Sequence, residues 1–167
     1  MSTPTFRPKY VSFDCYGTLI SWPMTPITKE LVGDQIPADK WDQFVAEFRG
    51  YRYDQVLGEY YPYDQVLQDA FDRVCRKWGI ESDPTAGKRF ADGVRSWGPH
   101  PDVPGPLKKM GEHYKLVILS NADESFLAES VPRLGAAICR NAILPIHSGW
   151  RSNNCSSAMK RSRMPLV

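Results

Sequence analysis

Two short apolar runs, each ending at a polar turn, constrain the fold of this chain most. The first run, residues 9–13, contains β-forming residues and stops at Asp14, and Gly17 follows in the turn. The second run, residues 115–119, is the strongest candidate for a buried strand, and a polar turn follows it directly. Apolar residues recur at three- and four-residue spacing across residues 26–97, as is typical of amphipathic helices. We therefore predict an α/β fold, a Rossmann-like parallel sheet interrupted after its first strand by a helical module.

The spacing also predicts individual helices. Gly79 is a plausible C-terminal stop for one of them, because glycine readily adopts the left-handed conformation that ends many helices. The helices are expected at residues 41–52, 66–78, 85–97, 106–114 and 124–134, with a turn-rich linker at 97–106.

The charge of the chain changes abruptly along its length. Up to Glu129 there are 19 acidic and 15 basic residues, which gives a net charge of −4. Residues 130–167 contain six basic residues and no acidic one, which gives +6. About five or six acidic residues would be expected there at the upstream frequency, so this segment needs an explanation of its own.

Composition excludes several classes of protein. No apolar run approaches the length of a membrane span, and the first residues lack the apolar region of a secretory signal. The cysteines are scattered, without the C-x-x-C spacing of a zinc site, and are expected to be unpaired thiols: Cys15, Cys75, Cys139 and Cys155. We therefore expect a cytoplasmic protein that does not bind a membrane.

The two predicted strand ends carry the candidate chemistry. Asp14 follows the first strand, and Ser120 and Asn121 follow the second. In an open parallel sheet, sites form beyond the carboxyl ends of the strands, so these side chains are expected to lie close together. A carboxylate held there can act as a nucleophile and form an ester that water later removes. The alternative is that Asp14 is only a turn or helix-capping residue.

These motifs resemble those of a known family. FDCYGTLI, residues 13–20, resembles the first motif of the haloacid dehalogenase (HAD) superfamily in the form D-x-Y-G-T-L. LVILSNAD, residues 116–123, resembles its second motif, whose key position is Ser or Thr. The helical module between them is similar to the cap domain of the subfamily that acts on L-2-haloacids. The resemblance extends over residues 8 to about 135.

The resemblance implies a division of the chain. A HAD core would comprise residues 1–20 and 105–135, and a helical cap residues 21–104. Residues 136–167 would be an atypical basic tail, and the C-terminal part of the core would be missing or non-native.

The residue two places after Asp14 separates the branches of this superfamily. Its phosphatases have a second Asp there, which protonates an alkoxide leaving group and lies where magnesium binds. This chain has Tyr16 instead. A halide is a very weak base and needs no general acid, whereas an alkoxide does. The loss of a carboxylate also weakens any Mg²⁺ site. Carbon–halogen cleavage without a metal or other cofactor is therefore expected.

The resemblance implies a mechanism. Asp14 would attack C2 of an L-2-haloalkanoate to give an aspartyl ester, whose hydrolysis releases a D-2-hydroxy acid. Backbone N–H groups near Cys15 and Tyr16, with the Ser120 hydroxyl, would hold the substrate carboxylate. Thr18 would orient Asp14 by a hydrogen bond.

The departing halide needs a cation, and the family places an arginine on a cap helix for this purpose. Arg49 is the first candidate, assisted by Asn121, and Arg52 is the second. The alternative for Arg49 is a solvated surface residue. The nearby aromatic residues at positions 41, 44, 48 and 51 are expected to belong mainly to the helix core.

The resemblance ends in the C-terminal segment. The family continues with a lysine followed by proline, and with a Ser-Ser-Asn motif that has an acidic residue beyond it. Residues 135–167 contain no Lys-Pro pair and no acidic residue. We interpret this as a frameshifted or truncated sequence from about Gly135, and we expect catalysis to suffer.

Two other functions stay open at this point. One is a HAD-type hydrolase of phosphate monoesters, against which Tyr16 argues. The other is a non-catalytic protein whose basic tail binds nucleic acid or an acidic partner. Six charges without interleaved aromatic residues are a weak nucleic-acid signal, so no nucleic-acid partner is expected. The expected partner is a small 2-haloalkanoate, and a homodimer is left open.

Overall fold

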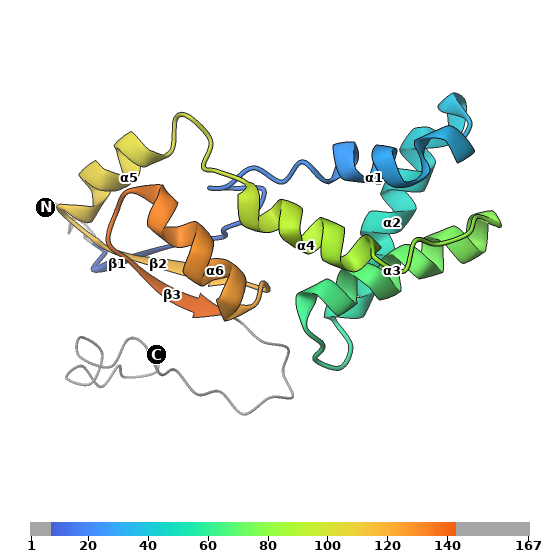
Figure 1. Cartoon of the computed structure of the whole chain (residues 1–167). Helices are drawn as coiled ribbons and strands as arrows, with labels where there is room; N and C mark the ends of the chain where they lie inside the picture. Colours follow the sequence, from blue (N-terminus) through green and yellow to red (C-terminus); the bar gives the residue numbers. More distant parts are fainter. Residues whose placement is uncertain (1–7, 143–167) are drawn as a thin grey trace, which may run out of the picture.

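The computed structural model describes residues 8–142 of the chain and contains a three-stranded parallel sheet. The strands are β1 (Tyr10–Phe13), β2 (Lys115–Ser120) and β3 (Ile138–Ala142), in the order β1-β2-β3 (Figure 1). Val11 is paired with Leu116, and Leu116 is paired with Ile138 on its other side. Parallel strands cannot be joined by a tight turn, so the chain leaves and returns between them.

The first return is long and helical. It consists of α1 (Met24–Val32), α2 (Trp41–Val56), α3 (Tyr63–Trp78) and α4 (Ala86–Ser96), with short 3₁₀ turns at Gly33–Gln35 and Ala38–Lys40. Helix α5 (Pro104–Gly111) then leads into β2, and α6 (Glu124–Ser130) with the 3₁₀ turn Val131–Leu134 connects β2 to β3. Figure 1 shows α1–α4 as a block beside the sheet, and α6 lying over the strands.

Local sequence explains how these helices begin and end. In α3 one face is apolar and buried, and Gly79 at its end has φ +67°, a left-handed conformation that glycine adopts without strain. The N–H of Ile80 donates to the carbonyl of Cys75 at 2.9 Å and closes the last turn. The stop that the sequence predicts at Gly79 is therefore confirmed.

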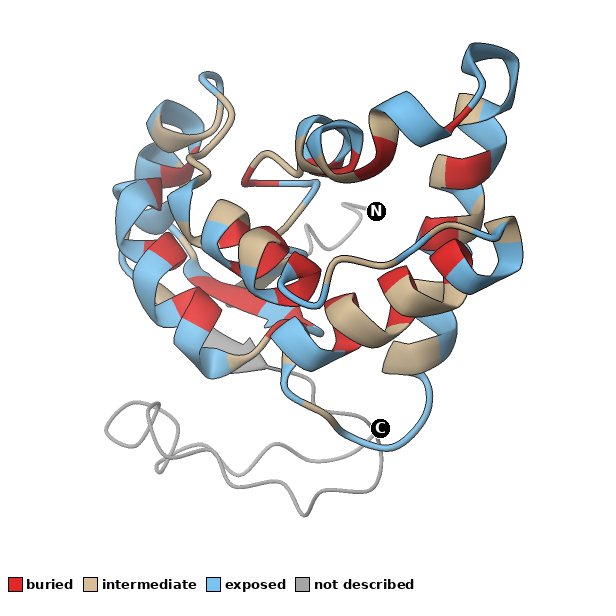
Figure 2. Cartoon of the chain, turned by 45° about the vertical axis from the view of Figure 1, so that its right-hand side comes forward, coloured by how far each residue is buried: buried red, intermediate tan, exposed pale blue. Residues whose placement is uncertain are grey.

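The buried side chains form two large clusters and a small one that joins them. The helical cluster contains Phe44, Phe48, Leu67, Phe71 and Phe90. The sheet cluster contains Cys15, Ile20, Leu116, Ile118 and Leu127. The joining cluster consists of Ala91, Val94, Ala122 and Phe126, from α4 and the start of α6. Figure 2 shows these buried positions in red along the sheet and on the inner sides of the helices.

The predicted α/β architecture is confirmed. Strand β3 lies in the segment after residue 135 and pairs along β2 from Leu116 to Ser120. The absence of acidic residues therefore does not mark the end of the sheet. Residues 143–167 of the predicted basic tail lie outside the described residues. In the described part, no helix is both long and apolar enough to cross a membrane.

Candidate active site

A tight loop after β1 presents Asp14 at the carboxyl edge of the sheet. The carbonyl of Cys15 accepts the N–H groups of Leu19 and Ile20 at 2.8 and 2.9 Å, which folds the chain back on itself. Gly17 sits at φ +86° in this loop, in the left-handed region that favours glycine. The motif therefore needs its glycine in order to hold the carboxylate of Asp14 outward.

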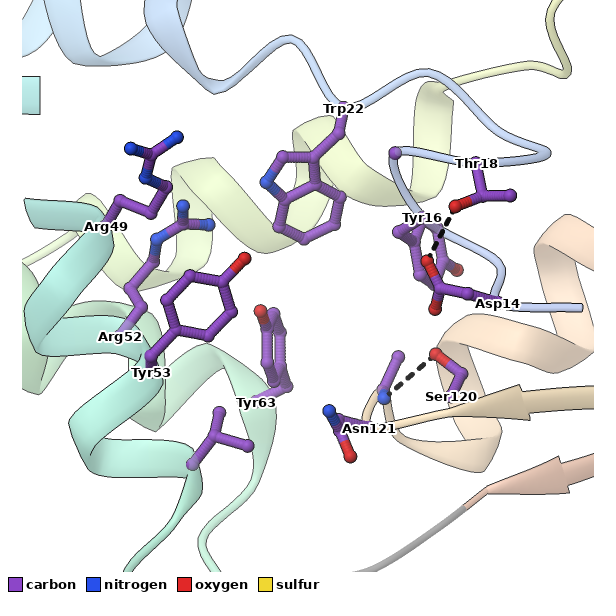
Figure 3. Close-up of a pocket in the computed structure, with 13 residues that line it drawn as sticks. Asp14, Tyr16, Thr18, Trp22, Arg49, Arg52, Tyr53, Tyr63, Ser120 and Asn121 are labelled. Carbon is purple, nitrogen blue, oxygen red and sulfur yellow. Dashed lines mark hydrogen bonds between the residues drawn. The ribbon is translucent and has the colours of Figure 1, made fainter. Parts of the chain in front are cut away.

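Thr18 fixes the orientation of that carboxylate. Its hydroxyl donates to Oδ2 of Asp14 at 2.9 Å, as the sequence predicts (Figure 3). Asp14 is exposed to the cavity described below. Among residues 8–142, no side chain donates a hydrogen bond to the other oxygen, Oδ1, which therefore faces the cavity without a partner.

The side chains of Cys15 and Tyr16 are not suited to act as nucleophiles. Cys15 is fully buried, and burial together with the charge of Asp14 raises the pKa of its thiol to about 12. The Tyr16 hydroxyl donates to Oγ of Ser130 at 2.8 Å, and burial raises its pKa to about 12. Neither group ionises near neutral pH. The Cys15 thiol does not line the cavity, whereas Tyr16 lines it as a neutral side chain.

The backbone of the loop has two N–H groups to spare. Those of Gly17 and Thr18 are used within the loop, by the carbonyls of Ile20 and Cys15. Those of Cys15 and Tyr16 enter no backbone hydrogen bond within the described residues. The two free N–H groups are those of the residues named from the sequence, Cys15 and Tyr16, and they lie next to Asp14.

The second strand end faces this loop. β1 and β2 run in register, with Phe13 opposite Ile118, so Asp14 and Ser120 emerge at the same edge of the sheet. Ser120 is buried and its Oγ accepts the N–H of Ala122 at 3.2 Å, which leaves its proton for another acceptor. Asn121 is exposed and lines the same cavity. The structure thus brings together the residues predicted from the two motifs.

A cavity of about 540 Å³ lies between these strand ends and the helical block. Figure 3 shows Asp14, Thr18, Ser120 and Asn121 on one side of it and residues of α2 on the other. The lining from the helical side comprises Trp22, Arg49, Arg52, Tyr53, Val56 and Tyr63. The site therefore has a polar floor at the sheet and an aromatic wall that carries two cations.

The two arginines of this wall differ in their surroundings. Arg49 is exposed, whereas Arg52 is half-buried, with its guanidinium 5.2 Å from the Phe48 ring centre and 5.7 Å from that of Trp22. Burial lowers the pKa of the Arg52 guanidinium, and the charge of Arg49 acts in the same direction. Both predicted candidates thus reach the cavity, and Arg52 is the one enclosed by aromatic rings.

Asp123 fastens the helical block to the floor of the site. Its carboxylate accepts the backbone N–H of Tyr63, the first residue of α3, at 2.7 Å. It also accepts the hydroxyl of Tyr60 at 3.1 Å. Because Asp123 directly follows Asn121 and Ala122, these bonds set the position of the aromatic wall relative to the second motif.

The lining of the cavity offers few carboxylate ligands for a divalent metal. Asp14 is the one carboxylate among the lining residues, and Mg²⁺ usually takes one or two carboxylates with further hard oxygen ligands. Asp123 is already engaged with Tyr60 and Tyr63. No cluster of three His, Cys, Asp or Glu side chains occurs in the described part of the chain.

Trp22 and Tyr63 are site residues that the sequence did not reveal. Trp22 lies between Tyr16 and Tyr63, with ring centres 5.3 and 6.2 Å away. Both are aromatic residues outside any recognised motif, and nothing in their spacing distinguishes them from core residues. Phe44 and Phe48, in contrast, belong to the helical core as predicted.

Solved structures of other proteins have a fold similar to that of this chain. Neither family models nor curated proteins give a match to the sequence. Among solved structures, a dehalogenase with an intermediate complex is similar, with a TM-score of 0.61 at 17% identity over 81% of this chain and 62% of that one. The L-2-haloacid dehalogenase from Xanthobacter autotrophicus gives 0.59 at 21% identity, over 79% and 56%. A structure of that enzyme holds covalently bound chloropropionic acid.

A third similar structure is the putative HAD-hydrolase YfnB from Bacillus subtilis, bound to magnesium. It gives a TM-score of 0.59 at 15% identity, over 82% of this chain and 66% of that one. The chain thus spans 56–66% of the length of these three structures. The likeness shows that the chain has the HAD fold, as the two sequence motifs imply.

Proposed function

We propose that this chain carries the site of a hydrolytic dehalogenase, which converts L-2-haloacids to D-2-hydroxy acids through an ester on Asp14. The observation that carries the proposal is the pairing at the first motif. Thr18 orients the carboxylate of Asp14 by a hydrogen bond. The residue two positions after Asp14 is Tyr16, whose hydroxyl donates a hydrogen bond to Ser130. Such a site has a nucleophile but no carboxylic acid for an alkoxide, which fits a halide leaving group.

In the first step, Oδ1 of Asp14 attacks C2 of the substrate from the side opposite the halogen. The new C–O bond forms as the carbon–halogen bond breaks, and the halide leaves with the bonding electrons. The N–H groups of Cys15 and Tyr16 and the Ser120 hydroxyl hold the substrate carboxylate. Arg49, assisted by Asn121, receives the halide, because a cation stabilises the charge that develops there.

In the second step, water attacks the carboxyl carbon of Asp14. The bond from that carbon to Oδ1 breaks, so the hydroxy acid leaves with Oδ1 and one proton of the water. The other proton of the water is released as the carboxylate of Asp14 forms again with the water oxygen. Configuration at C2 inverts once, in the first step. A base is needed for the water, and Asp14 is the one carboxylate among the lining residues of the described part. Ester hydrolysis is therefore the slow step in this chain.

Chloride release tests the proposal directly. Incubation of the purified chain with L-2-chloropropionate and a metal chelator is expected to release chloride, and Asp14→Asn is expected to abolish it. Because the second step is slow, intact-mass analysis should show protein heavier by the acid less hydrogen chloride, on a peptide that contains Asp14. Unchanged mass and no chloride from a folded sample would refute the proposal. Magnesium-dependent release of phosphate from a monoester would favour the phosphatase alternative instead.

A further inference from the structure

The wall of the cavity formed by α2 holds more positive charge than a halide requires. Arg49 and Arg52 lie one turn apart and both line the cavity. All 19 acidic residues of the chain occur by Glu129, within the described range, and no ion pair joins any of them to Arg49 or Arg52 there. Other arginines of the same helical block do pair, as Arg73 does with Asp54 at 2.7 Å. The wall is therefore cationic, and within the described residues no carboxylate pairs with it, although the side chain of Tyr63 interacts with Arg52.

Of the two arginines, Arg52 is the one whose Nε lacks a hydrogen-bond acceptor in the described part of the chain. It packs between Trp22 and Phe48, and its Nε is buried with no hydrogen-bond partner among residues 8–142. A buried donor without an acceptor is costly, and the half-buried guanidinium to which this Nε belongs has no carboxylate beside it. The aromatic faces offset part of that cost by cation–π attraction. The missing element is an anionic acceptor in the cavity.

That acceptor would lie away from the reacting carbon. Figure 3 shows Arg52 and Tyr53 on the side of the cavity opposite Asp14 and Ser120, with Trp22 and Tyr63 between them. A volume of about 540 Å³ falls in the range of cavities that enclose ligands much larger than a three-carbon acid. One ligand can therefore contact the sheet floor and the cationic wall together.

We propose that the substrate of this site carries a second anionic group, at the end remote from C2, and that Arg52 binds it. The chemical class is a 2-halodicarboxylate. Its first carboxylate sits by the loop of Asp14, and its chain runs along Trp22 and Tyr63 to Arg52. This assignment rests on the proposed dehalogenation, and it supplies an acceptor for the Nε of Arg52.

Substrate comparison tests the assignment. Chloride release or ester formation is measured for L-2-chloropropionate and for a series from 2-chlorosuccinate to 2-chloroadipate. We expect one of the diacids to react at least tenfold faster, in kcat/KM, than the monoacid. Arg52→Gln should lower the rate for that diacid at least tenfold more than the rate for the monoacid. Arg76→Gln, an exposed arginine of α3 away from the cavity, is the matched control and should change neither rate.

A binding measurement separates this inference from the proposed reaction. Calorimetry with unhalogenated glutarate and adipate against propionate uses the Asp14→Asn protein, which cannot react. Preferential binding of a diacid, lost about tenfold in Asp14→Asn with Arg52→Gln, supports the anion site even if no compound releases chloride. Equal binding of the mono- and diacids, or an Arg52→Gln effect equal for both, overturns it even if chloride is released.

Discussion

In the proposed mechanism, the reactivity of this site depends on Asp14 and on the hydrogen bond that Thr18 donates to it. This bond holds one carboxylate oxygen at 2.9 Å and leaves the other for attack. Hydrogen bonds to charged groups contribute about 1.5–3 kcal/mol, and here the contribution lies in orientation rather than in folding. The nucleophile and its positioning residue should therefore respond differently to substitution.

Thr18→Val removes this hydrogen bond and keeps the shape of the side chain. The expected result is a roughly 10- to 100-fold lower rate of ester formation on Asp14, because the carboxylate samples unproductive rotamers. Ester formation by intact mass is the measurement. Thr18→Ser retains the hydroxyl and should restore most of the rate, and a failure of Ser to outperform Val would contradict the positioning role.

Some residues of the site could be predicted from the sequence, and others could not. Asp14, Thr18, Ser120 and Asn121 could be predicted because each lies in a motif at a strand end, and the structure brings all four to one cavity. The environment of Arg52 could not be predicted. Its enclosure by Trp22 depends on the path of the chain from β1 into α1, which no local pattern specifies.

Helices α3 and α4 approach each other most closely at Gly87. A Cβ at this position would lie 2.4 Å from the carbonyl oxygen of Asp64 and 2.7 Å from Cβ of Gln68. The Gly87 N–H donates to Oε1 of Gln68 at 2.7 Å, so the contact is also specific. A glycine is therefore required where these two helices meet.

Gly87→Ala is expected to lower the free energy of unfolding by about 1–3 kcal/mol, because backbone has to move to relieve the overlap. Urea denaturation checks this. Gly50→Ala is the matched control. Gly50 is an exposed position of α2, and a Cβ there would meet no atom within 4 Å. That variant should gain about 0.5–1 kcal/mol from helix propensity. Equal effects of the two substitutions would be inconsistent with the close contact.

Glu47 ties α2 to α3 in a pH-dependent way. Hydrogen bonds from Lys77, Trp78 and Gln43 lower the pKa of its carboxyl from the ordinary 4.5 to about 2. The unfolded chain therefore binds a proton between these values that the folded chain does not, so the stabilisation is present above pH 4.5 and is lost as pH falls toward 2.

Glu47→Gln should accordingly lower the melting temperature at pH 7, and the difference from wild type should shrink as pH approaches 2. The effect is small, because Lys77 is about half exposed and water screens the pair. Thermal unfolding at several pH values is the measurement. A difference that stays constant with pH would assign the effect of Glu47 to packing.

Sequence predicted most elements but not the extent of the sheet. Helices such as α2 and α3 are specified by apolar spacing within one segment, so their positions could be predicted. Strand β3 reads Ile-Cys-Arg-Asn-Ala and has little alternation of its own. It is defined by pairing with β2, a contact across the chain that local pattern does not encode.

The molecule as a whole consists of two cores joined by a small contact. Phe126 is buried in the joining cluster, with its ring 4.6 Å from the Arg95 guanidinium carbon and 6.0 Å from the Tyr63 ring centre. Arg95 also pairs with Glu129 of α6 at 3.4 Å. Cooperativity between the helical block and the sheet depends on this contact and on Asp123.

Phe126→Ala is expected to cost about 3–5 kcal/mol and to uncouple the two cores. Peptide-resolved hydrogen exchange in the native state is the measurement. Wild-type peptides from β2 and from α3 should open with a common free energy, whereas in the variant the two values should separate. Phe126→Leu, which fills most of the volume, should cost about 1 kcal/mol and keep them together. Unseparated values in Phe126→Ala would place the coupling elsewhere.

The register of β1 with β2 also dictates an order of events during synthesis. Val11 pairs with Leu116, so β1 cannot form its hydrogen bonds with β2 until the ribosome has added residues 115–120. At about 5–20 residues per second, Asp14 precedes Ser120 by roughly 5–20 s. The helical block, whose contacts lie within residues 24–97, can fold in that interval. The helical side of the cavity can therefore fold before Ser120 and Asn121, on its sheet side, have been synthesised.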